Sequence, residues 1–359
     1  MPSSDTINKI LELARWAPSG DNTQPWRFEI VSDDELVIHG FDTHDHCVYD
    51  LDGMPSRLAH GALLETLAIA ASGFGLKVTI TFEPVSDTTR PRYRVALARD
   101  VGIGKDPLFD HIIVRVTQRR SMRMGGLDAA RREVLSAILT GAGGQVIWFD
   151  RLPLRLAIAK LLFRSAWIRL VTREAYEVHR AVIDWGKQFS ETALPDQALG
   201  ADALTVRMMR WAMADWRRVE FMNRYFGGTL APRIQLDLLP GLQCAAHFAL
   251  VAPGQLADGR AQVEVGRLLQ RFWLEVTRQD MYLQPEMTPL IFSRYVQSGV
   301  QFTKHVGAQA RARDVRERMG GLLGEATLER TFFFGRVGFG SAPSSRSLRL
   351  PPEKLIVRP

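Results

Sequence analysis

The sequence predicts an α+β fold in which mainly antiparallel strands alternate with long helices. Close pairs of strand-like segments separated by polar turns are typical of antiparallel sheets. A helical pattern rich in Ala and Leu, at 59–74, stands between two such pairs. The chain has 359 residues, of which 46% are hydrophobic and 24% are charged, so it can bury a large core without disulfides or metals.

The first part of the chain is predicted to form one unit of this kind. Its first helix has apolar residues at helical spacing and can be capped by Ser4 or Asp5. Its second helix stops at Gly73 and Gly75. In chain order, the predicted elements are a helix at 5–16, strands at 26–31 and 35–39, an irregular polar segment at 42–52, a helix at 59–74, and strands at 77–82 and 93–98.

A second unit is predicted to follow. Its long helix at 262–279 holds the same place as 59–74 holds in the first unit. In chain order, the predicted elements are helices at 110–118 and 127–139, strands at 145–149 and 246–252, a helix at 262–279, and a strand at 331–337.

A long segment, 150–235, interrupts the second unit. From 152 it has helical spacing and no strand alternation, and 203–226 is predicted to form one amphipathic helix with arginines along one side. Its many Trp and Met residues fit several interpretations: a lid over a ligand, an interface, a basic membrane-surface element, or the core of a helical subdomain.

The net charge of +7 and the pI near 9.7 indicate an anionic partner or a general arginine bias. The chain has no nucleic-acid-binding motif, so we expect no nucleic-acid partner. The two cysteines, Cys47 and Cys244, lack metal-like spacing and favour a reducing compartment. With no signal-peptide pattern and no apolar run of about 20 residues, we expect a cytoplasmic protein without a membrane span.

One loop carries the strongest functional signal. Residues 17–28 read A-P-S-G-D-N-T-Q-P-W-R-F, between a helical and a strand pattern. The prolines fix the path of the loop, and the glycine allows close approach to a ligand. Neutral hydrogen-bonding side chains beside an aromatic wall suit a flat ligand with polar edges. The candidate binding residues are Pro18, Ser19, Asn22 and Gln24.

This loop resembles a signature of the FMN-dependent nitroreductase superfamily, A/S-P-S-x-x-N-x-Q-P-W-x-F, at every fixed position. The resemblance implies an FMN cofactor, NADH or NADPH as the electron donor, and a small organic acceptor in a ping-pong scheme. It implies no catalytic side chains, because the flavin carries the redox chemistry. Family members are homodimers that bind FMN between their subunits.

A second motif, Arg119-Arg120-Ser121-Met122-Arg123, resembles the family's R-x-S-x-R/K segment, which holds the FMN phosphate. Guanidinium groups bind phosphate oxygens in pairs, and a serine hydroxyl adds a donor. The resemblance implies that Arg119, Arg120, Ser121 and Arg123 bind the cofactor, with Arg123 reaching the N1/O2 edge of the flavin ring. On its residues alone, this run also fits a solvated surface.

Two further segments resemble parts of the family site. The closing strand, glycine turn and basic pair at 334–349 imply that Arg346 and Arg349 join the phosphate site. Pro285 and Glu286 stand where the family chain lies against the flavin ring. A helix-capping loop is an equally good interpretation of these two residues.

The two main motifs stand in reverse order relative to ordinary family members, in which the phosphate motif comes first. Each unit keeps a different half of the site, so the chain resembles a tandem fusion that mimics the homodimer. The fusion implies a first unit at 1–106, a second at 107–359 that contains the 150–235 insertion, and one FMN site. It also implies a monomer or a weak dimer.

The leading hypothesis is an FMN-dependent NAD(P)H oxidoreductase of nitroreductase type. Two alternatives stay open: a flavin-binding or flavin-storage protein whose flavin is covered, and a specialised flavin dehydrogenase of a biosynthetic pathway. No metal site is expected, because a solvated loop explains His44 and His46 and their acidic neighbours better than a metal does.

Overall fold

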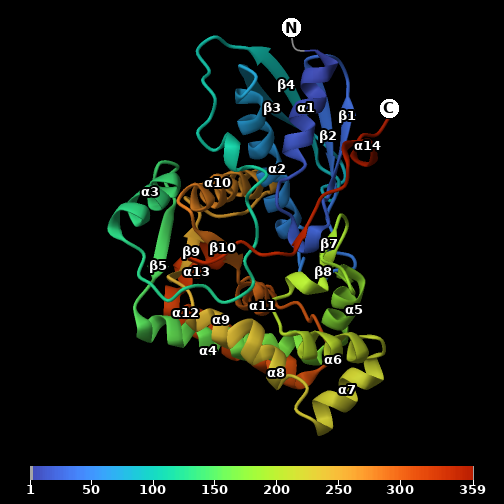
Figure 1. The fold of residues 1–359 in the computed structure, drawn as a ribbon, viewed down its shortest axis with the longest axis vertical. Coiled ribbons are helices and arrows are strands. Elements are labelled where there is room, and N and C mark those ends of the chain that lie inside the picture. The colour runs from blue at the N-terminus through green and yellow to red at the C-terminus, as the bar shows by residue number, and fades with distance from the viewer. Residues whose placement is uncertain (1–2, 359) are drawn as a thin grey trace.

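Helices and antiparallel strands build two four-stranded sheets in the computed structural model, which describes residues 3–358 (Figure 1). Each sheet has a long helix packed on it, and these two helices contact each other along their length. The predicted α+β class is confirmed.

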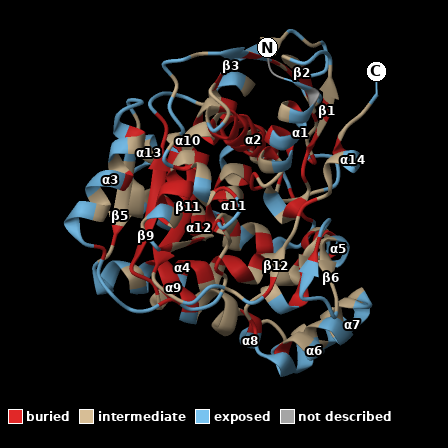
Figure 2. Ribbon diagram, turned by 45° about the horizontal axis from the view of Figure 1, so that its top comes forward, coloured by how far each residue is buried: buried red, intermediate tan, exposed pale blue. Residues whose placement is uncertain are grey.

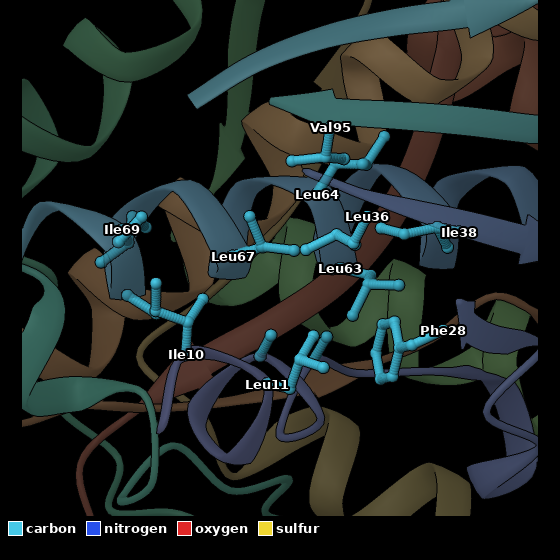
Figure 3. Close-up of a cluster of buried hydrophobic side chains, with 14 of the residues drawn as sticks. Ile10, Leu11, Phe28, Leu36, Ile38, Leu63, Leu64, Leu67, Ile69 and Val95 are labelled. Carbon is cyan, nitrogen blue, oxygen red and sulfur yellow. The ribbon is translucent and has the colours of Figure 1, made fainter. Parts of the chain in front are cut away.

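The first sheet contains the strands of the N-terminal part of the chain. They are antiparallel in the order β1-β2-β4-β3. Helices α1 and α2 bury their apolar faces on it, where Phe28, Leu36 and Leu63 meet in one cluster (Figure 3). The bounds are α1 Ser4–Ala14, β1 Trp26–Ile30, β2 Glu35–Gly40, α2 Met54–Ser72, β3 Leu76–Glu83 and β4 Arg92–Arg99.

The second sheet is antiparallel in the order β10-β11-β9-β5. Every residue of β9 and β11 is buried, because α3 and α10 cover one face while α4, α11 and α12 cover the other (Figure 2). The bounds are α3 Ala129–Thr140, β5 Gln145–Phe149, α4 Leu152–Val171, β9 Ala246–Val251, α10 Gly259–Arg278, β10 Tyr282–Pro285, α11 Thr288–Gln297, α12 Val306–Leu323, α13 Glu325–Arg330 and β11 Thr331–Gly338.

Helices α2 and α10 join the two sheets by crossing at close range. A methyl group on Gly61 would lie 2.0 Å from the Val263 carbonyl oxygen, and one on Gly266 would lie 2.4 Å from the Leu58 carbonyl oxygen. Glycine has no Cβ, so the two backbones can approach this closely. The crossing fixes the sheets relative to each other.

The insertion forms a helical layer at the end of the molecule opposite the first sheet (Figure 1). Its central helix, α4, packs on α12 and α9. Strand β7 pairs with β12 near the C-terminus, so the insertion and the tail are linked. The bounds are α5 Arg173–Val182, β6 Ile183–Asp184, β7 Phe189–Ser190, β8 Leu194–Pro195, α6 Ala203–Met213, α7 Trp216–Tyr225, α8 Leu230–Arg233, α9 Leu239–Leu242, β12 Arg346–Ser347 and α14 Pro352–Leu355.

The first two helices start earlier than predicted. The cap of α1 is Ser3, whose hydroxyl accepts a hydrogen bond from the Thr6 amide, rather than Ser4 or Asp5. Helix α2 also begins before its predicted start, with Pro55 in its first turn, where a missing amide hydrogen leaves no helical bond unmade.

The predicted helix at 110–118 is wrong. The chain makes one 3₁₀ turn at Phe109–His111 and then reaches β10, where the Gln118 amide donates to the Leu283 carbonyl. Tertiary pairing with β10 therefore overrides the helical pattern of this segment.

Two predictions for the insertion also need correction. The segment 203–226 forms two helices, because the Asp215 side chain accepts from the Arg217 amide and starts α7 as a new helix. The segment 152–235 also contains the two-residue strands β6, β7 and β8, which are too short to show alternation.

Outside the insertion, Pro285 ends strand β10 instead of lying in a helix-capping loop.

Candidate functional site

A cavity of about 450 Å³ lies where the two halves of the chain and the insertion meet. Its walls come from the loop after α1, from α2 and α10, from the segment 115–119, from 284–288, from 346–349 and from the insertion. Eight of the twelve predicted site residues line it: Pro18, Ser19, Asn22, Arg119, Pro285, Glu286, Arg346 and Arg349.

The loop after α1 has a strained backbone. Asp21, Asn22 and Gln24 have φ values of 49°, 62° and 48°, in the left-handed region that non-glycine residues rarely adopt. The Ser19 hydroxyl accepts from the Gln24 amide at 3.0 Å and closes the turn. Such strain persists only where the surroundings hold it, and it is common at ligand sites. The loop thus presents Pro18 and Ser19 to the cavity on a rigid path.

Two amide side chains of this loop bind the insertion. Nδ2 of Asn22 and Nε2 of Gln24 donate to the Glu191 carbonyl at 3.0 and 2.8 Å. Oε1 of Gln24 accepts from the Leu350 amide at 2.8 Å, so Gln24 lies behind the cavity wall and ties three segments together. Oδ1 of Asn22 is buried without a hydrogen-bond partner in the described chain. It can accept a hydrogen bond from a ligand.

Three arginines gather at the cavity, and no acidic residue of the described chain pairs with them. Arg115 donates to the Trp16 carbonyl, and Arg349 donates to the Ala17 carbonyl. Arg346 donates to the Arg115 carbonyl. In the described part of the chain none of the three forms an ion pair, and the charged neighbours of Arg115 and Arg349 are other arginines.

The electrostatics of this cluster favour an anion. Burial, reinforced by repulsion between the guanidinium groups, lowers the pKa of Arg115 well below its ordinary value and that of Arg349 to about 9. Within residues 3–358, Nε of Arg115 and Nε of Arg346 have no hydrogen-bond partner. Buried cations without a counter-charge are costly, and an anion that accepts these hydrogen bonds would relieve that cost. The cluster therefore fits a phosphate group.

A buried charged group lies beside the segment 284–288. Oε2 of Glu286 is 2.6 Å from Nδ1 of His247, and Oε1 accepts from Nη1 of Arg336 at 2.7 Å. Nε2 of His247 is 2.7 Å from the Gly241 carbonyl oxygen, so both ring nitrogens face acceptors. Burial disfavours the charged ring, but the Glu286 carboxylate raises the pKa of His247 to about 10. Because the cations of His247 and Arg336 share the single carboxylate of Glu286, the group carries a net positive charge at the cavity wall.

The insertion closes another side of the cavity with apolar residues, with His179 and with Arg169, which pairs with Asp237 at 2.6 Å. The Tyr49 hydroxyl is 2.9 Å from Nε2 of His179. Burial raises the pKa of Tyr49 and lowers that of His179 to about 3, so both groups are neutral near neutral pH. Among the insertion's apolar lining residues are Leu162, Leu170, Val182, Ile183, Leu194, Leu199, Met209, Met213 and Pro232. This placement favours the lid interpretation of the insertion.

Three of the residues predicted to bind the cofactor lie outside the cavity. Arg120, Ser121 and Arg123 are exposed, and none of them lines it. The Arg123 amide donates to the Phe339 carbonyl, which fixes this segment along the end of β11. Of the mid-chain motif, only Arg119 reaches the cavity wall.

Two residues of the cavity wall, Arg115 and Thr117, were missed at the sequence level. They belong to Arg115-Val116-Thr117-Gln118-Arg119, which has the R-x-S-x-R spacing with Thr in place of Ser. The signal was therefore present in the sequence but overlapped the run that begins at Arg119. Arg336 and Tyr49 also line the cavity, and no local pattern marked them.

The family model of the nitroreductase family matches residues 1–42, which contain the strained loop. This match confirms the resemblance to the nitroreductase superfamily. It indicates, in general terms, a flavin-dependent oxidoreductase. No curated protein matches the chain in a sequence search.

Within residues 3–358, no helix is both long enough and apolar enough to cross a bilayer. In the same residues no group of three or more His, Cys, Asp or Glu side chains is arranged to hold a metal ion, and Nδ1 of His44 pairs with Asp42 at 2.6 Å.

Proposed function

We propose that this protein is an FMN-dependent oxidoreductase of nitroreductase type that holds one flavin in the cavity. The carrying observation is the cluster of buried Arg115 and Arg349 with half-buried Arg346, which lies near the strained loop without a carboxylate partner in the described chain. FMN offers both parts of a matching ligand, because its phosphate suits the arginines and its flat ring suits the apolar cavity.

The residues at the wall fit this cofactor. When bound, FMN supplies two-electron redox chemistry. The net positive charge of the Glu286, His247 and Arg336 group would stabilise negative charge inside the cavity. The proposed phosphate donors are Arg115, Thr117, Arg346 and Arg349, and the residues proposed to flank the ring are Pro18, Ser19, Asn22, Arg119, Pro285 and Glu286.

The electron donor is proposed to be NADH or NADPH, with a small organic molecule as acceptor in a ping-pong scheme. The insertion side of the cavity favours an apolar acceptor with a hydrogen-bond acceptor atom, because Met209, Met213 and Tyr49 all line the cavity. Tyr49 can donate to such an atom while His179, which is neutral, holds the phenol in place.

We further propose that the chain is a tandem fusion of two family units, 1–106 and 107–359. Two observations support it: each half builds a four-stranded antiparallel sheet with one long helix packed on it, and the cavity takes residues from both halves. The fused pair would need no second chain to complete its site.

Flavin storage is the second candidate function, because the insertion lines so much of the cavity. Both candidates are tested on the purified protein, whose visible absorption shows whether flavin is bound. Without oxygen, rapid loss of the oxidised-flavin band on addition of NADPH or NADH supports the enzyme. Colour that yields to dithionite but resists both nicotinamides supports storage. A protein that binds no flavin contradicts both.

A further inference from the structure

The two helices α6 and α7, with the turn that follows them, expose an unusual amount of apolar surface. Seven large apolar residues in this hairpin, residues 203–230, are between 46% and 66% exposed. Figure 2 colours much of both helices as exposed. The residues are Leu204, Met208, Trp211, Phe221, Tyr225, Phe226 and Leu230.

Their spacing gathers them into stripes. Leu204, Met208 and Trp211 are four and three positions apart, on one side of α6. On α7, the ring centroid of Phe221 lies 5.4 Å from those of Tyr225 and Phe226. These side chains make an apolar surface on the outside of the molecule, whereas a helix face packed in the core would be covered.

Basic residues are interleaved with this apolar surface. The guanidinium of Arg218 lies 5.0 Å from the Trp211 ring centroid, and that of Arg224 lies 5.5 Å from that of Tyr225. The acidic residues of the hairpin are Asp215 and Glu220, and Asp215 is engaged as the cap of α7. The exposed arginines are Arg207, Arg210, Arg217, Arg218 and Arg224.

We propose that this hairpin docks the protein on anionic membrane surfaces. Trp, Tyr and Phe side chains prefer the boundary between lipid headgroups and acyl chains, and arginines beside them are attracted to anionic headgroups. The hairpin lies at the end of the molecule opposite the first sheet, where a flat bilayer can reach it (Figure 1). A symmetric contact between two copies is disfavoured, because it would bring the same five arginines together.

Helix α6 connects this surface to the cavity. It carries Met209 and Met213 at the cavity wall, whereas Met208 and Trp211 are exposed outside. This step alone rests on the proposed function. If that function holds, docking would place the cavity wall that carries Met209 and Met213, where the acceptor is proposed to bind, at the membrane. The acceptor class that fits is an apolar molecule dissolved in the bilayer.

The test is co-sedimentation of the full-length protein with vesicles. We expect binding to vesicles of phosphatidylglycerol and phosphatidylcholine, weak binding to phosphatidylcholine alone, and loss of binding at high salt. The measurement needs no flavin or turnover, so a failure of the proposed enzyme activity would leave its result unaffected.

Two variants probe the surface. Arg217→Gln with Arg224→Gln should lower vesicle partitioning about 25-fold, or about fivefold per charge, which corresponds to about 1 kcal/mol each. Trp211→Ser should lower it on both vesicle types. The matched control, Arg90→Gln with Arg99→Gln, removes two exposed arginines near the first sheet and should lower partitioning much less.

Three outcomes would overturn the proposal. One is the absence of vesicle binding by the parent protein. Another is an equal loss of vesicle binding in the double arginine variant of the hairpin and in the control, which would show that vesicle binding depends only on the net charge of the protein. The third is a dimer in sedimentation equilibrium that Trp211→Ser dissociates, which would assign the surface to a second copy.

Discussion

At the residue scale, the cavity owes its character to a few buried charges. Arg115, Arg346 and Arg349 direct hydrogen bonds at backbone carbonyls and repel each other, an arrangement that makes sense when an anion is bound. The assignment of Arg115 to the phosphate differs from the sequence motif, which gives this role to the run that begins at Arg119 and places Arg123 at the edge of the flavin ring. The two assignments predict different results for single substitutions.

We expect Arg115→Met to raise the dissociation constant of FMN by about 10- to 100-fold, because a charge-assisted hydrogen bond contributes about 1.5–3 kcal/mol. Arg123→Met is the matched variant, and it should change the constant by less than about twofold, because Arg123 is exposed outside the cavity. Quenching of flavin fluorescence on titration measures both. A larger effect at Arg123 than at Arg115 would show that FMN binds at the sequence motif that begins at Arg119.

The buried His247 predicts a pH dependence of stability. Its pKa is raised to about 10, so the folded protein holds this proton more tightly than the unfolded chain does. The stabilisation is fully present below about pH 6.5 and is lost as the pH rises to about 10. Urea unfolding across this range should show a decline in the free energy of unfolding that His247→Gln reduces. An unchanged decline in the variant would rule out a charged His247.

At the element scale, the crossing of α2 and α10 sets the geometry of the site. Both helices line the cavity, through Leu58 and Ala59 of α2 and Leu269 and Trp273 of α10. Anything that separates these helices must therefore move the cavity walls. The contact depends on Gly61, where no side chain can be added without displacing the α10 backbone.

We expect Gly61→Ala to destabilise the protein by about 1–3 kcal/mol through overpacking, and to weaken flavin binding as well. Gly321→Ala is the control, because Gly321 lies in α12 with open space around it, and the change should be neutral or stabilise by about 0.4–1 kcal/mol. Thermal unfolding of both variants measures the difference. Equal effects at the two glycines would show that the helix crossing tolerates a methyl group.

Many of the helices and strands could be predicted from the sequence, because periodicity marks elements that bury one face. The hairpin of β1 and β2 and helix α10 follow from such patterns, whereas α2, which is buried on nearly all sides, follows from its many Ala and Leu residues. The segment 110–118 could not be predicted, because its conformation is set by pairing with β10 far along the chain. The break between α6 and α7 had one signal in the sequence. Asp215, a residue type that caps helices, stands inside an otherwise continuous apolar pattern.

At the scale of the whole molecule, the site exists because distant segments meet. The tail returns to the first sheet, where the Val357 amide donates to the Phe28 carbonyl, and in doing so it brings Arg346 and Arg349 near the strained loop. The sequence predicted these participants through family resemblance, not through spacing. Arg336 and Tyr49 have no local signal, since burial beside a cavity is a property of the assembled fold.

The most direct test of the central claim compares FMN with riboflavin in calorimetric titrations of the flavin-free protein. The account predicts one FMN bound per chain and an affinity for riboflavin at least about 100-fold weaker, because riboflavin lacks the phosphate that the arginines bind. Equal affinities for the two flavins would contradict the phosphate site, and the function proposed from it would fall.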